Sequence, residues 1–258
     1  MEGIERMRNE VQQWIDLGFE YVRQIPPVQL YVAISVLFMT CFILLVVRLL
    51  KRSKSNTIVL SGIVGSGKTT MFFHLRDGTS HLGTVTSMEP NEDVFILHSE
   101  QAKVKIQPIH IVDVPGHYRL RPKLDEYIPN AAGIVFVVDA LEFLPNLRAV
   151  SEYLYDILTN ANVVRKKIPL LICCNKTDKV TAHTKDFIRK QLEKEIEKLR
   201  ASRNSVSEAD VTNEYTLGLP GEVFAFTQCV NKVTITEAAA ITGDLSNVEH
   251  FIRECVKP

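Results

Sequence analysis

The segment Gly62–Thr69 constrains the fold of this chain more than any other part of the sequence. It reads Gly-Ile-Val-Gly-Ser-Gly-Lys-Thr and matches the pattern G-x-x-x-x-G-K-[ST] at every fixed position. An apolar run, 57–61, precedes it and helix-forming residues 70–75 follow it, which is the strand–loop–helix context of a phosphate-binding loop. Its glycines let successive N–H groups turn toward phosphate oxygens, and the helix directs its positive end at the same anion.

Each residue type in this loop has an expected role. Lys68 is expected to reach the β- and γ-phosphates of a nucleotide, and the Thr69 hydroxyl is expected to bind Mg²⁺. The predicted nucleotide contacts of the loop and the helix that follows are Gly62, Val64, Gly65, Ser66, Gly67, Lys68, Thr69 and Thr70. Because such a loop occurs in ATPases, kinases and GTPases, it leaves the identity of the base open.

A second motif, D-x-x-G, ends the apolar run 106–112. Asp113 stands where that predicted strand ends, and Gly116 follows three residues later. A carboxylate at this place can hold Mg²⁺ through water, and the Gly116 N–H can contact a γ-phosphate and so sense its presence. The motif therefore predicts a metal ligand at Asp113 and a nucleotide contact at Gly116.

A third motif, N-K-x-D, follows the apolar run 168–174 and indicates the base. Asp178 can accept hydrogen bonds from the guanine N1–H and the exocyclic amine, whereas adenine offers neither donor there. That mismatch is expected to disfavour adenine by several kcal/mol, at about 1–3 kcal/mol for each unsatisfied group. Asn175 is expected to support the loop, and the stem of Lys176 is expected to lie along the ring. The three motifs together predict a site for GTP and Mg²⁺.

The segment 83–90 and the residue after Gly116 are candidates for sensing and hydrolysing the γ-phosphate. Thr86 is the preferred ligand for Mg²⁺ and the γ-phosphate, with Thr84 as the alternative. His117 stands where it could orient an attacking water, and it is the predicted catalytic residue. Val64 would crowd the γ-phosphate, which predicts hydrolysis that is slow or depends on a partner.

The last guanine contact is expected after a sixth strand at 223–228. The segment 229–232 reads Cys-Val-Asn-Lys, and the backbone of Val230 is the predicted contact.

The apolar runs alternate with helix-like segments, as in a doubly wound α/β domain with a mainly parallel sheet. Two of the runs are close enough to form a hairpin, which places one antiparallel strand at an edge. A helix is expected at 183–200 and a loop insertion at 201–222. The six predicted strands lie at 57–61, 94–97, 106–112, 133–139, 168–174 and 223–228.

An uncharged segment from Leu30 to Val47 precedes this domain. About 20 apolar residues suffice to cross a bilayer as a helix, so 30–50 is predicted to be a transmembrane helix. A cleaved signal peptide would have its apolar run much nearer the start of the chain. Basic residues gather after the run, which predicts a luminal or interfacial segment at 1–29, a basic linker at 51–55 and a cytosolic domain at 56–258.

Composition excludes two other classes of site. Thirty basic and thirty acidic residues give a formal net charge of zero, so no direct contact with nucleic acid is expected. The five cysteines have no regular spacing, which predicts free thiols rather than a disulfide framework or a zinc site.

The three motifs together resemble those of Ras-superfamily GTPases. The stretch Asp113–Arg121, D-x-P-G-H-x-x-L-R, is similar to the Arf-like branch. Together with the amino-terminal membrane helix and Thr84–Ser87, it resembles the family of signal recognition particle receptor beta subunits. That resemblance implies a single-pass protein of the endoplasmic reticulum membrane that, with GTP bound, recruits the receptor alpha subunit for co-translational targeting. An Arf-like trafficking GTPase and a permanently GTP-loaded membrane anchor are the alternatives.

Overall fold

The computed structural model describes residue 14 and residues 27–50, 56–78, 83–97, 108–207, 215–219 and 221–256. The chain divides into two compact units, Met1–Ser53 and Lys54–Pro258. Most of the predicted segment 1–29 and the whole of the predicted linker 51–55 lie outside the described residues.

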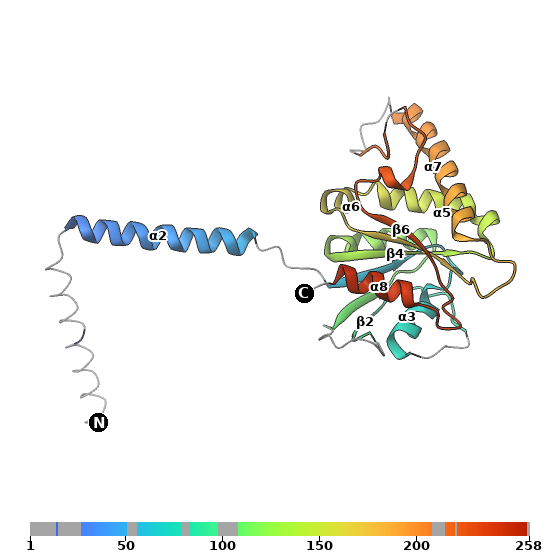
Figure 1. The fold of residues 1–258 in the computed structure, drawn as a ribbon, viewed down its shortest axis with the longest axis horizontal. Coiled ribbons are helices and arrows are strands. Elements are labelled where there is room, and N and C mark those ends of the chain that lie inside the picture. The colour runs from blue at the N-terminus through green and yellow to red at the C-terminus, as the bar shows by residue number, and fades with distance from the viewer. Residues whose placement is uncertain are drawn as a thin grey trace, which may run out of the picture. The chain divides into compact units, whose positions relative to one another are not determined.

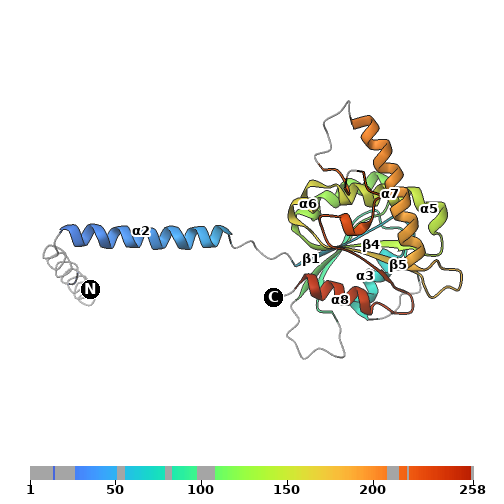
Figure 2. The same cartoon turned by 45° about the horizontal axis from the view of Figure 1, so that its top comes forward.

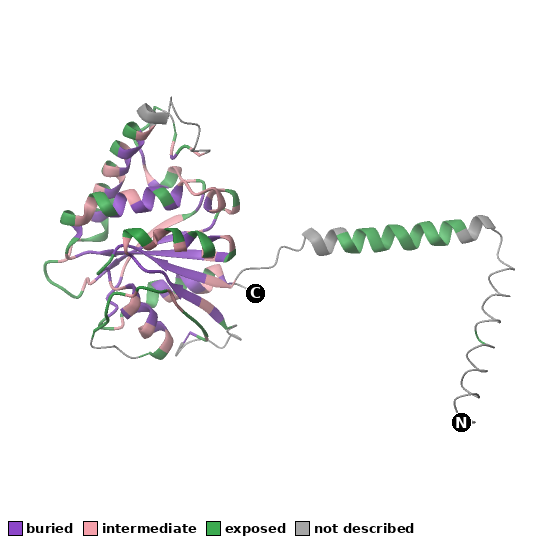
Figure 3. Ribbon diagram, turned by 180° about the vertical axis from the view of Figure 1, so that it is seen from behind, coloured by how far each residue is buried: buried purple, intermediate pink, exposed green. Residues whose placement is uncertain are grey.

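The described part of the first unit is dominated by one helix, α2 (Pro27–Leu50). It begins at a proline, which is tolerated in the first turn because the N–H groups there have no partner within the helix. The side chains of residues 31–45 are exposed, as the green ribbon in Figure 3 shows. Among the residues that the structure describes, no helix has the combination of length and apolar content needed to cross a membrane.

The second unit is built on one six-stranded sheet with the order β2-β3-β1-β4-β5-β6 (Figure 1). All neighbouring strands are parallel except β2 and β3, which pair antiparallel at one edge. This arrangement confirms the predicted α/β sheet with one antiparallel edge strand. The strands are β1 (Thr57–Ser61), β2 (Asn91–Phe95), β3 (Ile109–Asp113), β4 (Ala131–Asp139), β5 (Leu170–Asn175) and β6 (Val233–Glu237).

Helices cover both faces of the sheet (Figure 2). One face carries α3 (Lys68–Asp77) and α8 (Ser246–Cys255). The other carries α5 (Phe143–Leu158), α6 (Ala161–Lys166) and α7 (Lys185–Ser207). Short helical segments make up the rest: η1 (Tyr118–Lys123), α4 (Leu124–Tyr127), η2 (Ile128–Asn130) and η3 (Phe226–Gln228).

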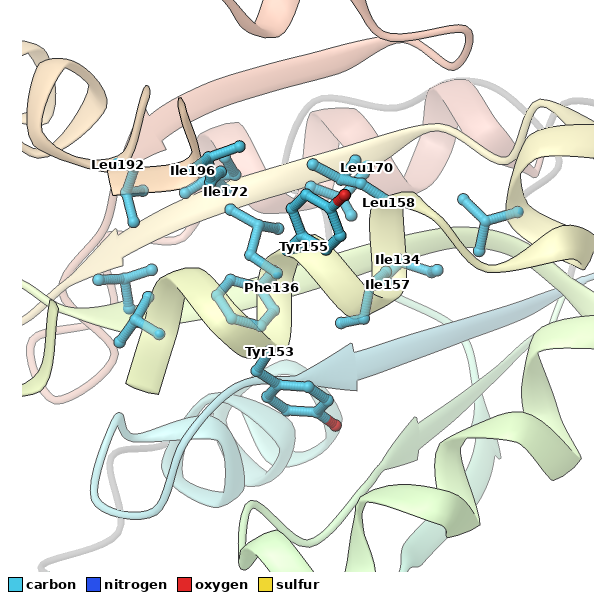
Figure 4. Close-up of a cluster of buried hydrophobic side chains, with 14 of the residues drawn as sticks. Ile134, Phe136, Tyr153, Tyr155, Ile157, Leu158, Leu170, Ile172, Leu192 and Ile196 are labelled. Carbon is cyan, nitrogen blue, oxygen red and sulfur yellow. The ribbon is translucent and has the colours of Figure 1, made fainter. Parts of the chain in front are cut away.

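Two apolar clusters, one on each face of the sheet, form the core. Successive side chains of a strand point to opposite faces, so Phe136 packs on the α5 side while Val135 and Val137 pack on the α3 side. Figure 4 shows Phe136 among the side chains of α5, α7 and β5. Strands buried on both faces read as continuous apolar runs, which is why most of the strands could be located from sequence.

The predicted strand at 223–228 is wrong. Residues 226–228 form η3, and the sixth strand is β6, which starts later. The N–H groups of Phe224 and Phe226 donate to the carboxylates of Glu197 and Glu193 on α7, at 2.8 and 3.1 Å, instead of pairing with a strand. Both phenylalanines are buried, so this apolar run packs into the core next to α7.

The predicted boundary between helix 183–200 and the insertion 201–222 also changes, because α7 continues to Ser207. Arg200, near the carboxyl end of α7, donates hydrogen bonds to the carbonyl oxygens of Leu217, Leu219 and Glu222. One largely buried guanidinium therefore ties the described part of the segment after α7 back onto the helix.

Candidate nucleotide-binding site

The three sequence motifs meet at one cavity. The strands β1, β3 and β5 are parallel, so the loops that follow them gather at the same edge of the sheet, where ligands of open α/β sheets bind. The cavity has a volume of about 230 Å³. Its lining residues are Val64, Gly65, Gly67, Lys68, Thr69, Thr70, Thr84, Val85, Thr86, Ser87, Asp113, Pro115, Gly116, Asn175, Lys176, Asp178, Ala240 and Ile241.

Two glycines allow the phosphate loop to lie close to the two later motifs. Gly67 has φ +89°, and a Cβ placed there would lie 2.3 Å from the Asn175 Nδ2. A Cβ on Gly116 would lie 2.6 Å from the Gly62 carbonyl oxygen. Any larger residue would therefore push the phosphate loop away from the two motifs that face it.

Lys68 is a buried cation without an anion in its own loop. Its Nζ donates to the Ile63 carbonyl oxygen at 2.8 Å, and the residue is only 6% exposed. Burial lowers the pKa of Lys68 to about 8, while the nearby Asp113 opposes that shift. A phosphate group bound in the cavity would supply the missing negative charge and raise that pKa again.

Nucleotide binding is therefore expected to take up protons in alkaline solution. Above about pH 8 the free protein has largely lost the Lys68 proton, whereas the phosphate-bound form retains it, so affinity falls as pH rises through this range. Titration calorimetry at about pH 8.5, in two buffers of different ionisation heat, should report an uptake approaching one proton per site. Lys68→Met should abolish the uptake, and an unchanged uptake in that variant would contradict the assignment to Lys68.

Asp113 has the environment of a metal ligand. Its Oδ2 accepts hydrogen bonds from the Thr69 hydroxyl at 2.7 Å and from the Asn91 amide at 3.1 Å. Its Oδ1 is buried and has no hydrogen-bond partner among the described residues. Burial raises the pKa of Asp113, although these hydrogen bonds and Lys68 act in the opposite direction. An unpaired carboxylate oxygen beside a hydroxyl suits a hard divalent cation, so Thr69 and Asp113 fit Mg²⁺.

The segment 83–90 borders the same cavity. Thr84 and Thr86 both line it, and the Thr84 hydroxyl lies 3.3 Å from that of Thr70. The preference for Thr86 as the metal ligand stays a prediction. Ser87 was not predicted, yet its hydroxyl lies 3.4 Å from that of Thr69 and accepts from Asn91. Neither Ser87 nor Asn91 belongs to a local sequence motif. They come close to Thr69 and Asp113 only because β2 pairs with β3.

Asn175 joins the phosphate loop to the loop after β6. Its Nδ2 donates to the Ser66 carbonyl oxygen at 2.8 Å, and its Oδ1 accepts from the Ala240 N–H at 3.0 Å. Ser66 is itself fully buried and is not among the residues that line the cavity. One side chain therefore fixes the distance between the expected phosphate end and the expected base end of the site.

Lys176 and Asp178 are the other polar residues of the N-K-x-D motif at the cavity. Lys176 has a left-handed backbone, φ 69°, and its Nζ forms an ion pair with Asp139 at the end of β4. The Asp178 carboxylate lies 3.3 Å from the Lys179 Nζ. Both residues line the cavity, and their roles toward the base stay predictions.

The predicted contact of Val230 is wrong. It precedes β6, at the edge of the sheet where strands begin, and its side chain is 59% exposed. The loop at the opposite end of β6 contributes Ala240 and Ile241 to the cavity instead. The cause is the position of the sixth strand, which ends at Glu237 rather than at 228, so the loop that follows it lies farther along the chain.

His117 does not line the cavity. Its Nδ1 accepts a hydrogen bond from the Arg119 N–H at 3.3 Å, and its ring lies 4.7 Å from that of Tyr118. The neighbouring Gly116 does line the cavity, so the backbone places His117 at the margin of the site. Its catalytic role stays a prediction.

The sheet order, the phosphate loop and the two later motifs define a nucleotide-binding domain with the fold of Arf-like small GTPases. The sequence profile of the signal recognition particle receptor beta subunit matches residues 53–233, and this chain belongs to that family. The family resemblance seen in the motifs is thereby confirmed.

Individual relatives agree with this assignment. The signal recognition particle receptor subunit beta of Mus musculus is 31% identical over 237 residues, which cover 90% of this chain and 86% of the relative. A structure of the mammalian SRP receptor has a TM-score of 0.69 at 30% identity, covering 78% of this chain and 100% of that chain. The SRb-GTP/SRX complex from Chaetomium thermophilum has a TM-score of 0.58 at 21% identity, covering 79% and 98%; this likeness concerns the fold.

Proposed function

We propose that this chain is the membrane-anchored, GTP-binding beta subunit of a signal recognition particle receptor. With GTP bound it recruits the receptor alpha subunit for co-translational targeting to the endoplasmic reticulum. The observation that carries the proposal is the convergence of Lys68, Asp113 and Asp178 on one cavity. The buried Lys68 amine suits a triphosphate, and the Asp113 carboxylate with its unpaired oxygen suits the metal. The Asp178 carboxylate suits the edge of a guanine base.

Bound Mg²⁺ would supply positive charge that neutralises the phosphates. Thr69, Asp113 and Thr86 are the residues that would hold it. The chain's own contribution is to bind and orient: Lys68 pairs with phosphate, Asn175 holds the two loops at a fixed distance, and Asp178 selects the base.

Exposed apolar side chains beside the cavity support recruitment of a protein partner. Val85, Met88 and Tyr118 are 89, 66 and 61% exposed. Val85 lines the cavity, and Tyr118 lies two residues beyond the cavity-lining Gly116. Segments that border a γ-phosphate site can change their order with the nucleotide, so a surface built on them can report the bound state. In the related complex SRb-GTP is bound to SRX.

The anchor is proposed on α2 and on its sequence. α2 has 24 residues, but no described helix combines the length and apolar content of a membrane span, so the proposal rests mainly on the sequence. No charged residue occurs between Leu30 and Val47, and basic residues follow. The same pattern supports a cytosolic location for the GTPase domain.

A permanently GTP-loaded anchor is the second candidate, and two observations favour it. Val64 lines the cavity with a branched side chain that is 43% exposed. The imidazole of His117 lies outside the cavity lining and accepts a hydrogen bond from the Arg119 N–H. Both features favour hydrolysis that is slow unless a partner reorients His117.

The recruitment proposal is tested with the full chain in detergent, loaded with a non-hydrolysable GTP analogue or with GDP and mixed with purified receptor alpha subunit. The analogue-bound form should retain the alpha subunit at least about tenfold more tightly, which corresponds to about 1.4 kcal/mol of coupling. Equal retention in both forms would exclude the switch. Single-turnover hydrolysis with and without the alpha subunit then separates a cycling GTPase from a permanently loaded anchor.

A further inference from the structure

Tyr153 reaches from α5 to the strand that leads into the phosphate loop. The Ser61 hydroxyl donates a hydrogen bond to the Tyr153 hydroxyl at 2.8 Å. Ser61 is fully buried and Tyr153 is 2% exposed, so water does not compete for this bond. Ser61 is the last residue of β1 and directly precedes Gly62. In Figure 4 the Tyr153 hydroxyl points away from Phe136 and out of the labelled apolar cluster.

The same ring contacts the segment that follows Gly116. The Arg121 guanidinium carbon lies 4.4 Å from the centre of the Tyr153 ring, a distance typical of a cation–π contact. The Arg121 Nε is buried and has no hydrogen-bond partner, and Arg121 forms no ion pair within the described part of the chain. The ring of Tyr153 is therefore the principal contact of this charge.

Packing beneath η1 is otherwise loose. None of the six residues of η1 is buried. A cavity of about 260 Å³ lies between η1, α4 and α5, with Tyr118, Arg121 and Tyr153 among its lining residues. The asparagine and aspartates that line it have partners other than Arg121, since Asn160 donates to Asp125 and Arg203 pairs with Asp156. Little besides the contact with Tyr153 holds Arg121 where it lies.

We propose that Tyr153 is a positioning residue that couples the phosphate loop to η1. Its hydroxyl fixes the end of β1, and its ring fixes Arg121, so the phosphate loop and Gly116 are held at one distance from each other. The inference rests on the proposed function, in which both elements contact the phosphates of GTP. GDP lacks the γ-phosphate that Gly116 would meet, so loss of the Arg121 contact weakens GTP binding more than GDP binding.

Variants of Tyr153 separate its two contacts. Tyr153→Phe keeps the ring but leaves the Ser61 hydroxyl buried and unpaired, and it should weaken binding of GTP and GDP equally, by up to about tenfold. Adding Ser61→Ala removes both polar groups and should restore most of that affinity. Tyr153→Leu also removes the ring, and it should lower the ratio of GTP to GDP affinity at least about threefold and speed amide hydrogen exchange in 117–123.

The experiment uses the full chain in detergent, with nucleotide affinities from competition against a fluorescent GDP and exchange followed by mass spectrometry. Arg121→Gln should reproduce the change in affinity ratio and exchange, whereas Arg119→Gln, whose guanidinium faces the exposed Tyr118, should not. If Tyr153→Leu lowers the unfolding temperature but changes neither the ratio nor exchange, Tyr153 only packs the core and the proposal fails. A wild-type chain that binds no guanine nucleotide would overturn the proposed function instead, and exchange in 117–123 would still test the Arg121 contact.

Discussion

Replacing Asp178 by asparagine is expected to lower the affinity for GTP at least about 100-fold and to make xanthosine triphosphate the better ligand. Asp178 lines the cavity, as does Lys176, and one of its carboxylate oxygens lies 3.3 Å from the Lys179 Nζ. A guanine edge presents two donors to this carboxylate, and an amide can satisfy only one of them. Xanthine carries a carbonyl oxygen in place of the exocyclic amine, so the new amide N–H has an acceptor there.

This change can be measured on the full chain by competition against a fluorescent nucleotide. The competitors are GTP, xanthosine triphosphate and ATP. Lys179→Ala is the matched control, because it removes the ion-pair partner of Asp178 without altering the carboxylate. Its effect should stay within a few-fold, as for other partly exposed ion pairs. If Asp178→Asn kept the GTP preference of the wild type, Asp178 would not contact the base.

Replacing Lys68 by methionine is expected to reduce affinity for GTP by at least about 100-fold. The Lys68 Nζ can make charge-assisted hydrogen bonds to two phosphates, each of about 1.5–3 kcal/mol, so their loss corresponds to two or more orders of magnitude. The nucleotide-free protein should become more stable at neutral pH, because the variant no longer buries a cation whose pKa is lowered to about 8.

Affinity from calorimetry and the midpoint of thermal unfolding together check the Lys68 prediction. Arg76→Met is the control on the same helix, since Arg76 pairs with Asp77 and is absent from the cavity lining. That variant should bind nucleotide as the wild type does. A Lys68→Met protein that bound GTP normally would show that the buried amine does not contact phosphate.

The phosphate end of the site could be predicted from sequence because its chemistry is local. Eight consecutive residues supply the loop, and Asp113 and Asn175 each end an apolar strand. Parallel strands then bring their carboxyl ends together without further information. The contacts of Ser87 and Asn91 with this cluster could not be predicted, because they depend on the pairing of β2 with β3.

The predicted sixth strand, and with it the guanine contact expected after that strand, was misplaced for a physical reason. The run containing Phe224 and Phe226 is more apolar than β6, so hydrophobicity alone favours it as a strand. Its N–H groups bind carboxylates of α7, a long-range contact that no local pattern reveals. β6 alternates valine, threonine and isoleucine and is half-buried throughout, as in an edge strand. That alternation, rather than hydrophobicity, marks the strand that leads to Ala240.

The most direct test of the account is the nucleotide preference of the full chain in detergent, measured by competition of GTP and ATP with Mg²⁺ and again after its removal with a chelator. Convergence of Lys68, Asp113 and Asp178 on one cavity predicts GTP binding at least about 100-fold tighter than ATP binding, and weaker GTP binding without the metal. Equal affinities for GTP and ATP, unaffected by the chelator, would contradict it.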